Sequence, residues 1–394
     1  MLPVEQRERA VWGTSLALAL LVGVFPQFAL GALGPQIRAD LGMSTAQLGV
    51  AFTALYLLGV AGSPLAGPLA DRIGGRRGCL ALLLLSGASL WAASFVSGPV
   101  GLYAAMLPAG AAMAMANPAT TRWSAAAPTP ATQASLVGIA QAGVQAGALV
   151  AGGLAASAAL GLDWRNGFRV GTLLAAVGAV AAWLSPRDEG SAPRSVIPTP
   201  QPGPEQRQTR RGLAVYALLM GGGTAVVFAY LPSYGVDVIG LSVSLAGATT
   251  LLFGATALIC RVLLGIALRD ANRLGPALLR LLSFGAGCAV LLIALGARNE
   301  VALWLGTVLF GATGTTWPVA AYLAVLRHSA PGAAGKLTGW VTASFYLGLW
   351  TTPAIAGWLI STSGYALAWA GSVLCYLGAA MTTSRVRGQR TATT

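Results

Sequence analysis

One basic side chain in this sequence stands out by its surroundings. Arg261 lies inside the apolar stretch 251–268. An ionisable residue at such depth marks a functional site by default, because an uncompensated charge in an apolar medium is costly. Its planar fork of N–H donors suits a carboxylate or another small oxyanion, held by two parallel hydrogen bonds. Arg261 is therefore the first candidate for contact with an anionic substrate.

The acidic residues give little support to proton or cation chemistry in the same region. The sequence has 11 of them, all in predicted loops or at predicted helix ends: Glu5, Glu8, Asp40, Asp71, Asp163, Asp188, Glu189, Glu205, Asp237, Asp270 and Glu300. The lone histidine, His328, falls at the end of an apolar segment, where a solvated position is expected. The pattern disfavours an antiporter that exchanges cationic drugs for protons.

Neutral polar and aromatic residues could complete a cavity around Arg261. Gln141 and Gln145 are four positions apart and share one face of a helix. Asn117 and Trp317 each precede a proline, and a proline frees backbone carbonyls that can line a cavity. The predicted substrate contacts are Arg261, Asn117, Gln141, Gln145, Trp317, Tyr346 and Tyr230. Packing in the protein core is the alternative for the aromatic members.

The patterns of metal and catalytic sites do not occur in the sequence. Its four cysteines, Cys79, Cys260, Cys288 and Cys375, lie in apolar segments without metal-ligand spacing. One histidine cannot build a histidine metal site, and no paired carboxylates or nucleophile–base arrangement is evident. We therefore expect no metal, no cofactor and no enzymatic activity.

The composition is that of an integral membrane protein. Of 394 residues, 56% are hydrophobic and only 9% are charged, and the mean hydropathy is +0.71. Soluble domains carry about 25% charged residues, so a soluble enzyme or a disordered regulator is excluded. The net charge of +13 is spread along the chain and does not form a patch, which argues against nucleic-acid binding.

Apolar segments of spanning length, about 20 residues each, occur twelve times. They fall at 11–35, 46–69, 78–96, 100–121, 133–157, 167–185, 212–235, 243–267, 275–296, 300–326, 337–360 and 365–384. The predicted fold is all-α, with 12 transmembrane helices in two six-helix pseudo-repeats. Residues 1–185 form the first half, a polar cytoplasmic linker covers 186–211, and residues 212–394 form the second half.

The basic residues predict the orientation. With the N-terminus inside, 19 of the 24 fall in cytoplasmic segments, four fall outside and Arg261 lies within a span. This asymmetry predicts a multi-pass protein of the cytoplasmic (inner) membrane with both termini cytoplasmic. Glycines and prolines also recur at offsets of 198 to 201 positions, as Gly67 and Gly265 do. A repeat of this kind places a binding site between the halves, near the membrane midplane.

Residues 67–77, GPLADRIGGRR, follow the second predicted span. They resemble the cytoplasmic loop motif G-x-L-x-D-R-x-G-R-R of the major facilitator superfamily of secondary transporters, with Gly75 where a basic residue is usual. The resemblance extends along the chain, with a degraded copy at Gly265 and Asp270. It implies that Asp71, Arg72 and Arg76 form a cytoplasmic latch that holds the outward-open state, while Gly67 allows close helix approach. The alternative is a plain positively charged loop.

Other features refine the resemblance. Arg261 looks like the anion-binding arginine of nitrate and oxalate/formate porters, but its counterpart in the first half is Ser63, so a pair of arginines is absent. The superfamily's usual arginine in the fourth span is missing. The antiporter glycine–proline pattern of the fifth span is half present, with Ala148 in place of proline.

From these observations we expect a secondary transporter of a small anion, most simply a monocarboxylate or similar monoanion. We expect it to work as a monomer in the lipid bilayer and by alternating access. We expect uptake of the anion, either by symport with protons or by exchange. The alternative is an efflux pump for amphiphilic or weakly acidic drugs. A receptor without transport is disfavoured, because the sequence has no soluble output domain.

Overall fold

The computed structural model describes residues 4–161, 163–186, 204–268, 275–321 and 334–385. Asp270, His328 and most of the predicted linker lie outside these residues. In the first half the helices are α1 (Val4–Ala32), α2 (Gly34–Leu41), α3 (Thr45–Ile73), α4 (Gly75–Ala93), α5 (Pro99–Ser124), α6 (Pro130–Ala156) and α7 (Trp164–Leu184). In the second half they are α8 (Pro204–Tyr234), α9 (Val243–Ala267), α10 (Pro276–Leu295), α11 (Glu300–Thr313), α13 (Ala334–Ser363) and α14 (Tyr365–Thr382).

Eleven of the twelve predicted segments coincide with one long helix each, and α2 is an additional short helix after α1. The described part of the remaining segment, 300–326, consists of α11, a turn and a short helical stretch. Among the described residues, nine helices are long and apolar enough to cross a membrane. The all-α membrane fold is thereby confirmed. One boundary differs, because α8 begins at Pro204, inside the predicted linker. Proline suits the first turn of a helix, where its missing N–H has no partner to lose, so the polar stretch 204–211 extends α8.

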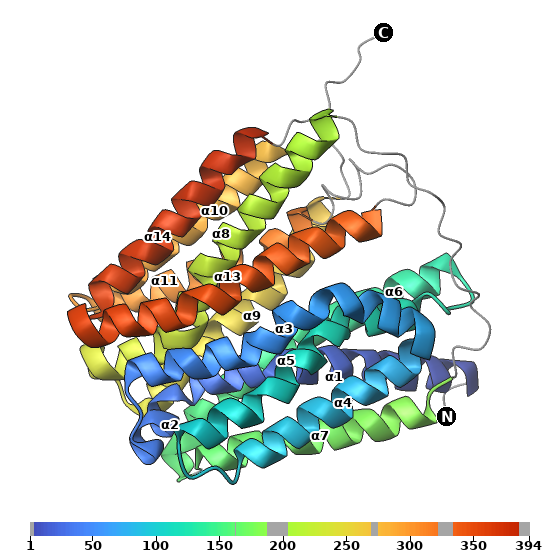
Figure 1. The fold of residues 1–394 in the computed structure, drawn as a ribbon, viewed down its shortest axis with the longest axis horizontal. Coiled ribbons are helices and arrows are strands. Elements are labelled where there is room, and N and C mark those ends of the chain that lie inside the picture. Colours follow the sequence, from blue (N-terminus) through green and yellow to red (C-terminus); the bar gives the residue numbers. More distant parts are fainter. Residues whose placement is uncertain (1–3, 162, 187–203, 269–274, 322–333, 386–394) are drawn as a thin grey trace.

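The helices form two bundles, one from each half of the sequence (Figure 1). Helices α1 to α7 pack in the first bundle, and α8 to α14 in the second. The bundles meet chiefly where α3 packs on α13 and α6 packs on α9, and α1 also touches α8. The side of the molecule where α1 begins and α14 ends is called the termini side below, and the opposite side the far side.

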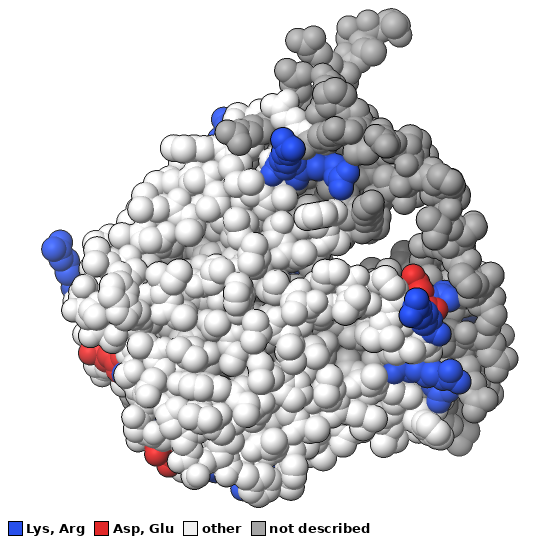
Figure 2. All heavy atoms as spheres, in the orientation of Figure 1, with Lys and Arg blue, Asp and Glu red and all other residues white. Residues whose placement is uncertain are grey.

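Charged side chains gather at the two sides and leave a broad uncharged belt between them (Figure 2). The described surface exposes many large apolar side chains, among them Leu173, Leu281 and Leu374. Such a surface is costly in water and stable in a lipid bilayer. The pattern of the sequence and the surface of the folded chain thus agree.

A single residue separates α3 from α4. Gly74 has φ +87°, a conformation that side-chain-bearing residues rarely adopt, and it ends one helix and begins the next. The following Gly75 lies against the backbone of Trp123 in α5, so that an added Cβ would overlap it. This packing explains why glycine stands where the motif usually has a basic residue.

Helix α11 ends at Thr313, residues 314–316 form a turn, and residues 317–321 are helical again. Pro318 lacks an N–H, so the Gly314 carbonyl loses its helical donor. Val319 donates instead to Thr316 at 3.1 Å, and the Thr315 carbonyl is thus left outside the helical ladder. Pro318 thus frees a backbone carbonyl, and the lining of a cavity by that carbonyl stays a prediction.

Candidate functional site

The guanidinium of Arg261 lies half-buried at the boundary between the two bundles. Its Nε and one terminal nitrogen donate to the Thr315 carbonyl at 3.1 and 2.6 Å. Across the boundary, the amide oxygen of buried Gln145 accepts from all three guanidinium nitrogens at 3.0 to 3.1 Å once the amide is oriented to suit them. Two residues predicted to contact substrate, Arg261 of α9 and Gln145 of α6, therefore touch each other. The Thr315 carbonyl, which follows the end of α11, is the third group at this site.

Thr315 is a member of the site that sequence analysis did not identify. Its position three residues before Pro318 was the available signal, because the carbonyls freed by a proline lie three and four positions before it. The second freed carbonyl, that of Gly314, accepts from the Thr224 hydroxyl at 3.5 Å. Both groups therefore have partners, and one of those partners is Arg261.

The structure brings a second pair of predicted contacts together. Gln141 of α6 donates to the side-chain oxygen of Asn117 of α5 at 3.2 Å. Gln141 is exposed and lies one turn toward the termini side from Gln145. The pair belongs to the first bundle alone, so it lines the boundary without crossing it.

Two of the aromatic candidates, Trp317 and Tyr346, contact other aromatic rings of the second bundle. Trp317 is fully buried and packs on Tyr216 and Phe345, with ring centroids 5.6 and 5.3 Å away. Tyr346, also buried, has its ring tilted against that of Phe345, with centroids 6.1 Å apart. Trp317 is thus held as a core residue of the second bundle, the alternative considered from sequence. Substrate contact by either residue stays a prediction.

Tyr230 stands where the bundles close on the far side. Its hydroxyl donates to the Pro353 carbonyl of α13 at 2.6 Å and lies 3.5 Å from the Thr45 carbonyl of α3. The side chain is fully buried. In this conformation Tyr230 joins helices of both bundles, and substrate contact by this residue likewise stays a prediction.

Four phenylalanines form a cluster across the boundary: Phe28 of α1, Phe228 of α8, Phe253 of α9 and Phe310 of α11. Phe28 meets Phe228 edge-on at 5.0 Å, and Phe228 stacks on Phe253 at 5.6 Å. Phe253 is eight residues before Arg261 on α9, about 12 Å toward the far side. The cluster seals the boundary beyond the guanidinium with apolar surface.

Glycines show that the bundles are closed on the far side. At Gly49 an added Cβ would overlap the Tyr230 hydroxyl and the Pro353 carbonyl, and at Gly357 it would meet Thr45 of α3. At Gly152 it would overlap the backbone of Leu251, and at Gly247 that of Ala155. Helices α3 and α13, and α6 and α9, therefore approach to backbone contact there.

On the termini side the same four helices stand apart. At Gly67 of α3, Gly138 of α6, Gly265 of α9 and Gly339 of α13, an added Cβ would meet nothing within 4 Å. Figure 2 shows the surface hollowed between the two bundles on this side. The structure is therefore a conformation open to the termini side, and Arg261 lies between that opening and the phenylalanine cluster.

An ion pair adds to the closure on the far side. Arg38 of α2 donates to Asp237, which follows α8, at 2.6 Å, and Tyr365 of α14 donates to the same carboxylate oxygen at 2.7 Å. Arg38 and Asp237 are 199 positions apart, within the repeat offset of 198 to 201. The sequence thus held a signal for this contact, because equivalent positions of two parallel repeats can face each other across their axis.

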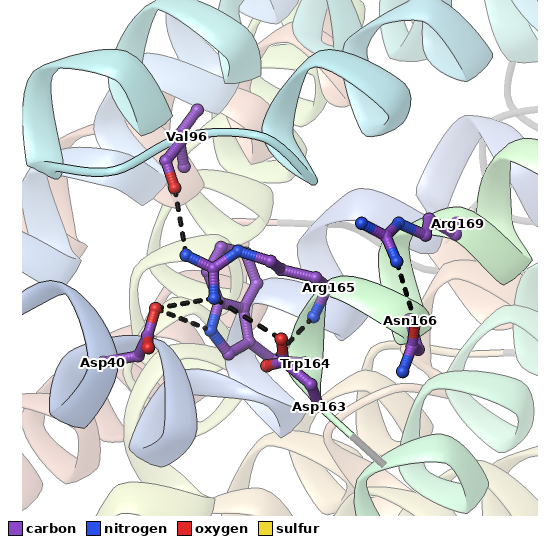
Figure 3. A network of polar contacts seen from close by, with 7 residues as sticks. All are labelled: Asp40, Val96, Asp163, Trp164, Arg165, Asn166 and Arg169. Atoms are coloured by element: carbon purple, nitrogen blue, oxygen red, sulfur yellow. Dashed lines mark hydrogen bonds and ion pairs between the residues drawn. The ribbon is translucent and has the colours of Figure 1, made fainter.

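The neighbouring residues of α2 are held within the first bundle. Asp40 binds Arg165 at 2.7 Å and accepts from the indole of Trp164 at 3.3 Å (Figure 3). Arg165 also donates to the Val96 carbonyl at 3.2 Å. These contacts fix α2 to the start of α7 and thereby place Arg38 at the boundary.

We expect Asp237→Asn to loosen the closure on the far side modestly. The pair is partly solvated, with side-chain exposures of 19% and 32%, so its loss should cost at most about 1 kcal/mol, a fivefold change in populations. Spin labels at exposed Val100 and Val301, on far-side ends of the two bundles, measure the opening after the native cysteines are replaced. Longer distances are expected.

Asp40→Asn is the matched control, because it removes a carboxylate–arginine pair on the same side but within one bundle. It should leave the distance between Val100 and Val301 unchanged. Equal effects of the two variants would contradict a gating role for Asp237.

The loop motif is arranged within the first bundle in this conformation. Asp71 pairs with Arg122 of α5 at 3.5 Å. Arg76 donates to the Ala182 carbonyl at 2.8 Å and to the Trp183 carbonyl. Arg72 is exposed, and the motif's Gly67 faces open space. A latch between the bundles would require the termini side to close, so the implied role of these residues stays a prediction.

The sequence profile of the Major Facilitator Superfamily matches residues 16–349. The chain belongs to this superfamily. The resemblance in residues 67–77 is thus confirmed over most of the chain, and with it the character of a multi-pass membrane transporter. A search of curated proteins finds no match.

Solved structures of superfamily transporters share the fold over nearly the whole chain. A D-xylose–proton symporter has a TM-score of 0.74 at 16% identity, with 95% of this chain and 96% of that chain covered. The nucleoside transporter NupG, solved as a mutant, gives 0.75 at 14%, with 96% and 100% covered. A bacterial homologue of the lysosomal transporter Spinster, inward-facing and unoccupied, gives 0.70 at 17%, with 96% and 95% covered. At these identities the likeness concerns the fold alone.

Proposed function

We propose that the protein moves a small monoanion, such as a monocarboxylate, across the inner membrane by alternating access. The observation that carries the proposal is the placement of Arg261. Its guanidinium stands at the boundary of the bundles, between the phenylalanine cluster and the opening on the termini side, and is held by neutral oxygens of Thr315 and Gln145. A carboxylate is a stronger acceptor for a guanidinium than a neutral oxygen.

The orientation of the proposal comes from the basic residues. If the termini side is cytoplasmic, as the 19-to-4 distribution predicts, the present conformation is inward-open. Asn117 and Gln141 then line the same opening, and the phenylalanine cluster with Arg38 and Asp237 closes the path from outside. Uptake by proton symport or by exchange, in a monomer, completes the proposal.

The proposal is tested by thermal unfolding of the detergent-solubilised protein with a panel of solutes. The panel contains formate, acetate, lactate, benzoate, nitrate, succinate, glucose and tetraphenylphosphonium. A ligand at 100 times its dissociation constant stabilises by about 2.7 kcal/mol. We expect monoanions to raise the melting temperature of the wild type and of Arg169→Ala, a surface control, but not of Arg261→Ala.

A second candidate is efflux of an amphiphilic or weakly acidic compound. The observation in its favour is the contact between Arg261 and Gln145, which joins the bundles and could serve closure alone, beside an apolar wall of phenylalanines. Stabilisation by tetraphenylphosphonium and not by any monoanion would favour this candidate.

A further inference from the structure

The amide oxygen of Gln145 lies over the face of the Arg261 guanidinium, the group that an anion would bind. It lies within 3.0 to 3.1 Å of all three guanidinium nitrogens, while the Thr315 carbonyl accepts from Nε and one terminal nitrogen. Thr315 belongs to the same bundle as Arg261, whereas Gln145 belongs to the other. The contact to Gln145 therefore crosses the boundary that must rearrange during transport.

The burial of Gln145 beside Arg261 explains why an amide side chain is favourable at this position. Its side chain is only 2% exposed, and a buried amide without partners is costly, as is a buried guanidinium whose acceptors are removed. Each group satisfies the other when no solute is present. A neutral acceptor is also weaker than a carboxylate, so the contact can be exchanged for a bound anion.

We propose that Gln145 is an internal stand-in for the substrate, bound to Arg261 in the empty carrier and displaced by the entering anion. The proposal rests on the anion transport proposed above. The affinity for the anion is then set by a competition, because the amide lies against the same guanidinium that the carboxylate must approach. This assigns Gln145 a role opposite to direct substrate binding.

Two near-isosteric substitutions separate the roles. Gln145→Leu removes the competing acceptor and keeps most of the volume, so the anion should bind more tightly, roughly tenfold, equivalent to about 1.4 kcal/mol. Gln145→Glu places a permanent carboxylate on the guanidinium, so added anions should no longer bind. A residue that contacts the substrate directly would instead weaken binding when changed to leucine.

Gln141 provides the matched control. It is the same residue type one turn away on α6, and its partner is Asn117 of the same bundle. Gln141→Leu should not tighten anion binding, and Gln141→Glu should not abolish it. The comparison separates displacement from Arg261 from a general change of polarity or charge in the opening.

The experiment titrates acetate, benzoate and nitrate separately against the melting temperature of the wild type, the four glutamine variants and Arg261→Ala. Tighter binding in Gln145→Leu with lost binding in Gln145→Glu supports the stand-in. Wild-type affinity or weaker binding in Gln145→Leu, with the response still lost in Arg261→Ala, overturns the stand-in and leaves the anion site intact. A response that survives in Arg261→Ala, or no response in wild type and Gln145→Leu alike, overturns both proposals.

Discussion

Arg261→Lys is expected to weaken binding of the stabilising monoanion about 100-fold, close to 3 kcal/mol. Lysine keeps the positive charge but lacks the planar fork that can hold the Thr315 carbonyl and a second acceptor at once. The loss should appear in the dissociation constant from isothermal titration and in uptake by proteoliposomes.

Arg38→Lys is the control for this prediction. Arg38 also lies at the boundary of the bundles, but it pairs with Asp237 on the closed side, away from the opening. Its replacement should leave the dissociation constant within a few-fold of the wild type. An unchanged constant in Arg261→Lys would confine Arg261 to a gating role and favour the efflux alternative.

A pair of glycine substitutions on α3 is expected to fix the carrier in opposite conformations. At Gly49 a leucine side chain would overlap Tyr230 and Pro353, so the far side could no longer close. At Gly67 the same side chain fits the present conformation, where nothing lies within 4 Å, but would obstruct closure of the termini side. Overpacking of this kind costs about 1–3 kcal/mol or more, which shifts populations by about fivefold to more than 100-fold.

The spacing of the glycines identifies the contacts that Gly67→Leu should obstruct. Gly67 lies 18 residues after Gly49 on α3, and Gly339 lies 18 residues before Gly357 on the oppositely directed α13. Gly49 lies opposite Pro353 and Gly357 lies opposite Thr45. Since each interval is about 27 Å, Gly67 and Gly339 lie about one helical turn apart in depth on the termini side. The pair Gly265 and Gly138 likewise lies on the termini side, on α9 and α6.

Spin-label distances on both sides of the protein measure these outcomes. The far-side labels are at Val100 and Val301, and the termini-side labels are at exposed Leu184 and Met381. Gly49→Leu should lengthen the far-side distance and shorten the termini-side one, whereas Gly67→Leu should keep the wild-type distances of this conformation. Both variants should lose uptake.

Gly371→Leu on α14 is the matched control, because it also adds a leucine to an open helical position but outside the four boundary helices. It should keep both distance distributions and the uptake rate. A shortened termini-side distance in Gly67→Leu would contradict the assignment of that contact.

The sequence by itself determined the features that depend on local composition. Apolar segments of spanning length predict helices in a membrane whatever their neighbours, and eleven of the twelve segments coincide with one long helix each in the described residues. The loop motif and the repeat offset predicted the superfamily and two matched halves. Arg261 was recognisable because a charge in an apolar segment is unusual in isolation, and Pro318 because a proline breaks a helix by its own chemistry.

Only the tertiary structure decided which groups meet. Gln145 reaches Arg261, and Tyr230 reaches the Thr45 carbonyl, because two bundles come together in one of several relative positions. That choice depends on contacts summed over four helices, which no local pattern encodes. The relative position of the bundles also brings Arg38 to Asp237 and leaves Gly67 facing open space. The sequence of a helix predicts which residues point inward, but only the packed bundles determine which residues lie opposite them.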